Sequence, residues 1–143
     1  MATLPPLIPY LGFDGNCADA MRFYVKALGA KIEMMMSGAD SPMAKDIPKE
    51  FAHRIIHARL SLPNGAMIFG GDAPAHVPYE GIKGVSLTLD YATPAEARKA
   101  FDALAEGGQV TMPFGPTFWA KGTGMVTDRF GVSWITNGEV IPM

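Results

Sequence analysis

GFDGNCADAMRFYVKALGA, residues 12–30, is the stretch on which the fold depends, and it describes a strand end, a turn and a helix. Asp14, Asn16 and Cys17 can each begin the helix, and Asn16 is the best N-cap residue among them. Gly29 is placed to end the helix in a left-handed turn. Apolar residues recur between these points at helical spacing, at Ala20, Phe23, Tyr24, Ala27 and Leu28.

The same plan occurs a second time, in PAEARKAFDALAEGGQV at residues 94–110. Thr93 is expected to cap this helix, Pro94 to take its first position, and Glu96 to complete a capping box. Gly107 and Gly108 are expected to end it. The chain therefore carries a duplicated strand–helix unit.

The segments around the two helices predict four strands in each half, one before the helix and three after it. In the first half we expect strands at 7–13, 30–36, 52–62 and 66–71, the last two joined by the Asn64-Gly65 turn. In the second half we expect a strand from Val85 to Asp90 and others at 109–112, 124–127 and 132–137. Connections are expected at 37–50, 72–83 and 113–123, and the first is a possible lid. The order is βαβββ twice, an α+β class.

Composition narrows the choice of function and location. The net charge of −2 and the lack of a basic stripe argue against a nucleic-acid partner. No apolar run reaches the roughly 18–20 residues that span a bilayer, so no membrane partner is expected. The first residues, MATLPPLIPY, do not have the pattern of a signal peptide. The lone Cys17 suits a reducing compartment, and we expect a cytoplasmic protein.

Several motifs together resemble one superfamily. Tandem βαβββ units, with FDGNCADAMRFY, IIHARLSL, TFWAKGTGMVTDRFGVSW and the later ITN, resemble the vicinal oxygen chelate superfamily of glyoxalase, bleomycin-resistance and dioxygenase proteins, and within it the PhnB-like proteins. The resemblance implies one glyoxalase-like domain at 1–143, made of modules 1–75 and 82–143. It also implies an incomplete barrel with the helices on its convex face, a small-molecule ligand on its concave face, and a homodimer.

The resemblance also locates where a metal would lie. Enzymes of this superfamily draw four His, Glu or Gln ligands from strands, and in this chain those positions fall near Ile8, Phe69, Gly84 and Ile135. None of these side chains can coordinate a metal ion, and their neighbours in sequence include no His or carboxylate. We therefore expect no metal site and no cofactor.

His53 and His57, in HRIIH, have the spacing of a helical metal pair, but the surrounding Ile and Leu residues favour a strand. On a strand, His57 and Arg59 share one face, which we expect to be the concave one. His57 is then either a hydrogen-bonded structural residue or an acid/base or ligand-binding group, and Arg59 an anchor for an anion. His76 lies in the connection at 72–83, where a surface position is expected.

The same alternation adds further ligand-binding candidates. They form an apolar lining with a few hydroxyl groups, typical of a small-molecule site: Tyr10, Met67, Phe69, Ser86, Thr88, Ser133 and Ile135. Trp119 either caps this site or seals the end of the core. Asp128 and Arg129 fit an ordinary hairpin turn, and Cys17 either packs or has a lowered thiol pKa.

PhnB-like proteins often carry a methyltransferase label. Gly70-Gly71 and Gly107-Gly108 lack the spacing of a glycine-rich cofactor loop, so we do not expect that activity. We expect a protein that binds a small molecule without the superfamily metal. One alternative is a lyase, isomerase or dioxygenase with unusual metal ligands, such as His57 with partner-chain residues. Another is a sequestering module.

Overall fold

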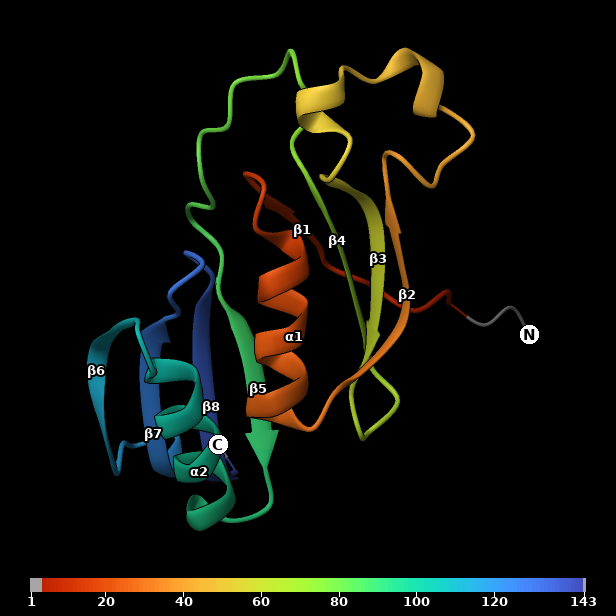
Figure 1. Ribbon diagram of the computed structural model, residues 1–143. Coiled ribbons are helices and arrows are strands. Elements are labelled where there is room, and N and C mark those ends of the chain that lie inside the picture. The colour runs from red at the N-terminus through yellow and green to blue at the C-terminus, as the bar shows by residue number, and fades with distance from the viewer. Residues whose placement is uncertain (1–3, 143) are drawn as a thin grey trace. The chain divides into compact units, whose positions relative to one another are not determined.

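The computed structural model describes residues 4–142 and divides into two compact units, Met1–Gly81 and Ile82–Met143. The two units are called unit 1 and unit 2 below (Figure 1). Residues 1–3 and 143, where the expected modules begin and end, lie outside the described residues. Neither α-helix within residues 4–142 has the length and hydropathy required to traverse a lipid bilayer.

Unit 1 is a four-stranded mixed sheet with one α-helix on one face (Figure 1). The strand order is β1-β4-β3-β2, with β1 and β4 parallel and the other pairs antiparallel. The elements are β1 (Tyr10–Phe13), α1 (Cys17–Leu28), β2 (Lys31–Ser37), η1 (Ala44–Asp46), η2 (Lys49–Phe51), β3 (Ile55–Ser61) and β4 (Met67–Asp72).

Unit 2 repeats this topology. Its strand order is β5-β8-β7-β6, again with one parallel pair, β5 and β8. The elements are β5 (Leu87–Tyr91), α2 (Pro94–Ala105), β6 (Gln109–Gly115), β7 (Ala120–Thr127) and β8 (Ser133–Val140). The βαβββ order expected for each half of the chain is therefore confirmed, as is the α+β class.

The ends of the helices follow from local sequence in three cases out of four. Gly29 ends α1 at φ 67°, in the left-handed region that glycine tolerates. Thr93 caps α2, because its Oγ1 accepts a hydrogen bond from the Glu96 N–H at 3.2 Å, and α2 ends next to Gly107. Asn16 occupies the N-cap position of α1, but its side chain makes no capping hydrogen bond.

The core of unit 1 lies between α1 and the sheet. Ala58, Leu60 and Ile68 are buried on this face. A Cβ on Gly70 would lie 2.6 Å from the Met21 side chain of α1, so the helix approaches the sheet closely at this glycine. Because strand residues alternate between faces, the side chains of residues 57, 59, 67 and 69 lie on the face opposite α1.

Several expectations about strand bounds were wrong. The strand expected at 52–62 begins only at Ile55, so His53 lies in the turn before it, and the strand expected at 132–137 continues to Val140. The first strand begins at Tyr10 rather than at residue 7, and Leu7 is exposed. Ser86 precedes β5 instead of lying in it, and Val85 is likewise exposed. The expected loop 113–123 is largely strand, since β6 continues to Gly115 and β7 begins at Ala120.

Candidate functional site

A row of side chains crosses the open face of unit 1, the face opposite α1. Tyr10 pairs with Phe69 across β1 and β4, Phe69 pairs with Arg59 across β4 and β3, and Arg59 pairs with Met34 across β3 and β2. All four strands therefore contribute one residue each to this row. Three of the residues expected in a ligand site, Tyr10, Arg59 and Phe69, are thus direct neighbours.

His57 lies on the same face of β3, two residues before Arg59. Its ring stacks on Tyr10, with centroids 5.7 Å apart and planes 19° apart, and meets Phe69 edge-on at 5.2 Å. The Arg59 Nε–H donates a hydrogen bond of 3.1 Å to His57 Nε2. In this arrangement Nε2 carries no proton, so the neutral ring holds its proton on Nδ1. We call Tyr10, His57, Arg59 and Phe69 the Arg59 cluster.

Arg59 is the charged member of the cluster. It is exposed, and its guanidinium lies over the Phe69 ring, 5.2 Å from the centroid. None of the ion pairs among residues 4–142 involves Arg59. A guanidinium held by its Nε–H and stacked on a ring keeps its terminal N–H groups for an incoming anion.

Tyr10 closes one end of the cluster. Its hydroxyl donates to the Ile56 carbonyl at 3.2 Å and occupies the space that a side chain at Gly71 would need, 2.7 Å from the Cβ position. Partial burial of the hydroxyl, and after it the nearby Cys17, raises the pKa of Tyr10. Met67 lies two residues before Phe69 on the same face of β4, and Met36 pairs with His57. The surroundings of Arg59 on this face are thus rich in aromatic and thioether groups.

The candidates in unit 2 are spread along its own open face. Thr88 and Ile135 are paired across β5 and β8. The Ser133 and Thr127 hydroxyls lie 3.2 Å apart and hydrogen-bond to each other. Ser86 is exposed before β5 begins. Hydroxyl groups and one isoleucine thus lie near each other, without a charged group among these candidates.

Trp119 belongs to a polar network on this face. Its Nε1–H donates to Asn137 Oδ1 at 3.1 Å, and the same oxygen accepts from Thr123 Oγ1 at 2.8 Å. The Asn137 amide donates in turn to Asp90 at 2.9 Å. Asn137 and Thr123 are buried, and the indole covers polar side chains that are hydrogen-bonded to one another. The exposed Phe118 contacts the Trp119 ring edge-on, at 5.0 Å between centroids.

A separate pocket of about 350 Å³ lies in unit 1, under the connection between β2 and β3. None of the ten ligand-binding candidates from the sequence lines it. It is lined by Met43, Asp46, Ile47, Pro48, Phe51, Arg54, Ile56, Asp72, Ala73, Pro74, Ala75 and His76. Sequence patterns missed these residues because most of them lie in segments without periodicity, although the 37–50 loop marked the region.

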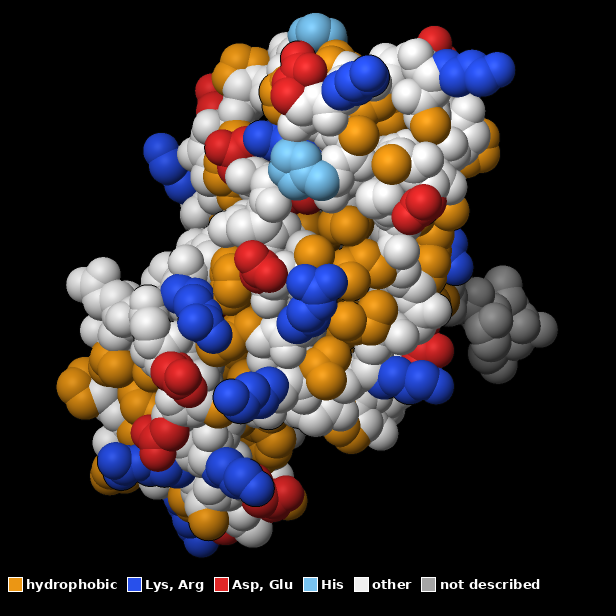
Figure 2. Space-filling view, in the orientation of Figure 1, with side chains coloured by type: hydrophobic (Ala, Val, Ile, Leu, Met, Phe, Trp, Pro, Cys, Tyr) orange, Lys and Arg blue, Asp and Glu red, His pale blue; other side chains and the backbone are white. Residues whose placement is uncertain are grey.

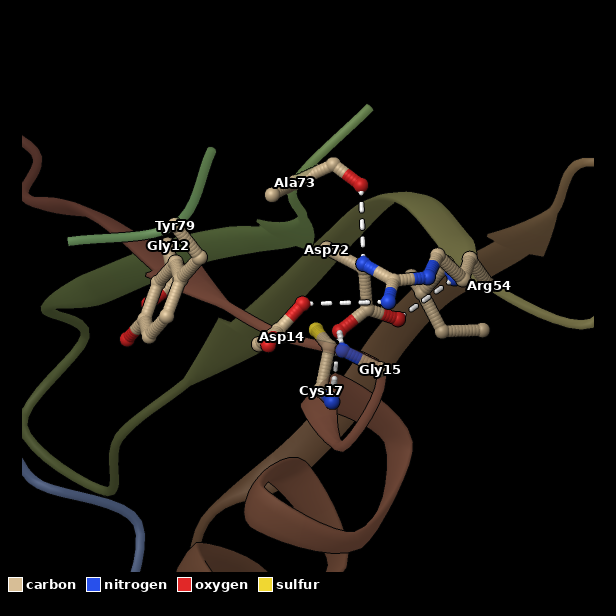
Figure 3. A network of polar contacts seen from close by, with 9 residues as sticks. Gly12, Asp14, Gly15, Cys17, Arg54, Asp72, Ala73 and Tyr79 are labelled. Carbon is tan, nitrogen blue, oxygen red and sulfur yellow. Dashed lines mark hydrogen bonds and ion pairs between the residues drawn. The ribbon is translucent and has the colours of Figure 1, made fainter. Parts of the chain in front are cut away.

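Behind this pocket a polar network ties β4 to the start of α1 (Figure 3). Asp72 Oδ1 accepts hydrogen bonds from the Gly15 and Cys17 N–H groups at 2.8 and 3.0 Å, and Oδ2 accepts from the Ile55 N–H at 2.8 Å. Arg54 donates to the Ala73 carbonyl at 3.0 Å and pairs with Asp14 at 3.0 Å. A strand carboxylate thus accepts the first N–H group of α1, that of Cys17, whereas the Asn16 side chain expected to cap the helix makes no capping hydrogen bond.

Cys17 lies in this network and is fully buried. Burial, and after it the neighbouring Asp72, raises the pKa of its thiol to about 12. A lowered thiol pKa, one of the two readings from the sequence, is therefore wrong. The residue acts in packing.

Within residues 4–142, no three His, Cys, Asp or Glu side chains are close enough to hold an ion together. Asp128 accepts hydrogen bonds from the Phe130 and Val132 N–H groups and from the Trp134 indole, so it stabilises its own hairpin.

In the view of Figure 2, acidic and basic side chains are interspersed, and no continuous basic stripe crosses this face.

Comparisons with known proteins point to one family. The family model described as 3-demethylubiquinone-9 3-methyltransferase matches residues 5–136. Protein YjdN of Escherichia coli (strain K12) is 36% identical over an alignment of 143 positions, which covers 92% of this chain and 94% of YjdN. Protein PA1353 from Pseudomonas aeruginosa is 46% identical, with a TM-score of 0.87 over 95% of this chain and 98% of that one.

Two further solved structures place the family within a wider fold. The PhnB protein from Bacillus cereus is 25% identical, with a TM-score of 0.76 over 93% of this chain and 98% of that one. In fold alone, the chain is similar to a glyoxylase/bleomycin resistance protein/dioxygenase domain from Frankia sp. EAN1pec, at 14% identity and a TM-score of 0.63 over 97% and 98% of the two chains. The chain therefore belongs to the PhnB-like family described as 3-demethylubiquinone-9 3-methyltransferase, which has the glyoxalase/bleomycin-resistance fold.

Proposed function

We propose that this protein binds a small amphipathic molecule with an anionic group on the open face of unit 1. The observation that carries the proposal is Arg59. Its guanidinium is exposed, stacked on Phe69 and fixed by His57, without an ion pair among the described residues. A cation held in this way is suited to a carboxylate or a phosphate group.

The rest of the cluster supports an apolar or aromatic part of the same ligand. Tyr10, His57 and Phe69 present ring faces and edges around the guanidinium, and Met67 extends the surface along β4. Aromatic rings bind other rings through offset or edge-on contacts, and methionine adapts to ligand shape. The candidates in unit 2, Thr88, Ser133 and Ile135 with Trp119, are proposed to contribute hydroxyl and apolar contacts for a ligand on that sheet.

We do not carry the methyl-transfer activity in the family's description over to this chain. Each sheet holds a single parallel strand pair, in contrast to the doubly wound parallel sheet on which glycine-rich cofactor loops are built. Gly70 and Gly71 lie inside β4, while Gly107 and Gly108 follow a helix. Binding and sequestration, with or without turnover, is the function the site supports best.

The alternative of a metal-dependent lyase, isomerase or dioxygenase needs an imidazole nitrogen of His57 as a ligand. Nε2 already accepts the Arg59 hydrogen bond and Nδ1 carries the proton, so an ion at His57 would have to displace one of them. Metal analysis of the purified protein separates the two functions. A stoichiometric transition metal, lost together with activity in His57→Ala, would favour the alternative.

Binding to the cluster is tested with indole-3-acetate and its uncharged analogue indole-3-acetamide, followed by amide NMR shifts of the whole protein. We expect saturable shifts at Tyr10, His57 and Phe69, and binding of the acetate about tenfold weaker in Arg59→Gln, because a charge-assisted hydrogen bond is lost.

Arg98→Gln is the matched control, since Arg98 is also an exposed arginine over a phenylalanine ring, Phe114 at 5.6 Å. It should bind both probes like the unmodified protein. Equal affinity for the two probes, or equal losses in the two variants, would refute the role of Arg59. We further propose a cytoplasmic homodimer, and light scattering after size-exclusion chromatography tests the dimer.

A further inference from the structure

The pocket under the β2–β3 connection has a defined wall. The Gly38 N–H donates to the Arg54 carbonyl, and the Ala39 N–H to the Ala52 carbonyl, both at 2.9 Å. Ser41 is buried, and its hydroxyl donates to the Gly38 carbonyl at 2.8 Å. The connection is thus fixed at its base by backbone hydrogen bonds, and the pocket it covers is a built feature of unit 1.

The lining of the pocket is mainly apolar. Met43, Ile47 and Phe51 come from the connection, and Ile56 and Ala75 from other segments of unit 1. A volume of about 350 Å³ is at the lower end of the range for small-molecule sites, which suits a compact molecule of one or two rings. An apolar lining of this size takes such a molecule by removing its surface from water.

The charges at the pocket are unevenly compensated. Arg54 is neutralised by Asp14 and bonded to the Ala73 carbonyl, and Asp72 accepts three backbone N–H groups. Asp46 lines the pocket, is exposed, and takes part in none of the ion pairs among residues 4–142. The lining thus holds a carboxylate, Asp46, that is neither ion-paired nor bonded to backbone N–H groups among the described residues, which favours a neutral or cationic ligand over an anion.

The geometry points to a second small-molecule site in this pocket, for a neutral or cationic aromatic compound of one or two rings. Met43, Ile47, Phe51 and Ala75 form its apolar walls, and Asp46 selects against anions. The site shares no side chain with the Arg59 cluster, so it does not depend on the function proposed above. The two sites have opposite charge preferences.

Indole is the first probe, titrated into the full-length protein and followed by amide NMR shifts. We expect saturable shifts at Ile47 and Ala75, with an affinity of about millimolar for so small a ligand. Ala75→Phe should fill the pocket and weaken binding at least about tenfold. Ala95→Phe, at an exposed position on α2, is the matched control and should bind indole like the unmodified protein.

If Ala75→Phe disturbs the fold, Met43→Trp decides, because Met43 also lines the pocket and is exposed, so a larger side chain there can occupy the pocket without displacing the core. Arg59→Gln should leave indole binding unchanged, which keeps this result separate from the test of the Arg59 cluster. Shifts confined to other residues, or unweakened binding in the filled variant that folds, would overturn the proposal.

Charge selection is tested with tryptamine and indole-3-acetate, which carry the same ring with opposite charges. We expect tryptamine to bind this pocket about two- to fivefold tighter than indole, as is usual for an exposed charge pair, and indole-3-acetate to bind more weakly. Asp46→Asn should abolish the preference, whereas Asp102→Asn, an exposed aspartate of α2, should keep it. Stronger binding of the anion here would overturn the assigned ligand class.

Discussion

The carboxylate of Asp72, at the end of β4, accepts the backbone N–H of Cys17, at the start of α1, at 3.0 Å. The same carboxylate accepts the N–H groups of Gly15 and Ile55. One side chain thus joins the start of the helix, the start of β3 and the end of β4. Since the N-terminus of a helix carries partial positive charge, the carboxylate is stabilised there by this charge as well as by its hydrogen bonds.

We predict that Asp72→Ala destabilises the protein by about 2–4 kcal/mol, because three partly buried N–H groups lose their acceptor. Asp72→Asn keeps one acceptor oxygen and should cost about half as much. Urea unfolding gives the free energies. Asp102→Asn, on the exposed side of α2, is the control and should change stability by less than about 0.5 kcal/mol.

Cys17 makes the stability of the fold sensitive to alkaline pH. The native thiol has a pKa raised from 9.0 to about 12, so the unfolded chain releases the thiol proton first as the pH rises. The free energy of unfolding is therefore unaffected by the thiol below pH 9. It falls between pH 9 and 12, by up to about 1.4 kcal/mol per pH unit.

Urea unfolding at a series of pH values checks this prediction, with Cys17→Ala as the comparison. The variant should show a shallower decline between pH 9 and 10. Above pH 10 the tyrosines contribute as well, because burial raises the pKa of Tyr10, Tyr79 and Tyr91. Identical slopes in the two proteins below pH 10 would show that the thiol does not carry the effect.

Local sequence signals predicted the elements whose causes are local. Gly29 and Thr93 end and begin their helices through contacts within a few residues, and both ends were predicted. The cap of α1 was not, because its acceptor, Asp72, is 55 residues away from Cys17 in the chain. No pattern within the helix indicates such a partner.

The start of β7 was missed for a different reason. Gly122 lowers strand propensity and was placed in the expected loop 113–123, so the expected strand began only at Gly124, but in the structure both glycines lie in β7 and make room for aromatic rings. A Cβ at Gly124 would lie 2.3 Å from the Phe101 ring, and one at Gly122 would lie 2.7 Å from Phe114. These glycines mark close packing against α2 and β6.

The candidate functional residues also divide into those that a local pattern predicted and those that depend on contacts between distant segments. Period-two alternation placed Tyr10, His57, Arg59 and Phe69 on one face, and the structure brings these four together. The pocket at Asp46 and Ile47 was outside the reach of periodicity, because its walls are irregular segments joined only in the fold. Alternation predicts a face, whereas a cavity depends on tertiary contacts.

The packing at Gly124 gives a third prediction. Gly124→Ala should destabilise the protein by about 1–3 kcal/mol, since the added methyl group overlaps the Phe101 and Phe114 rings in the core of unit 2. Gly115→Ala, where no atom lies within 4 Å of the Cβ position, should be within about 0.5 kcal/mol of the parent. Thermal and urea unfolding of both variants test the contrast, and equal effects would contradict it.

Two buried threonines of unit 2 give the last prediction, because they differ in their hydrogen bonds. Thr136 is 1% exposed, and its Oγ1 has no hydrogen-bond partner among residues 4–142. Thr123 is equally buried, but its Oγ1 donates to Asn137 at 2.8 Å. Replacing threonine by valine keeps the shape and the β-branched character that suits a strand.

Thr136→Val should therefore stabilise the protein by about 1 kcal/mol, because it removes a polar group that was desolvated without compensation. Thr123→Val should destabilise it by about 1–3 kcal/mol, because it takes a donor away from the buried Asn137 carbonyl. Urea unfolding of the two variants under identical conditions measures both free energies. The opposite signs are the test: if Thr136→Val were as harmful as Thr123→Val, the Thr136 hydroxyl would have to be bonded in solution, and its isolation in the core would be refuted.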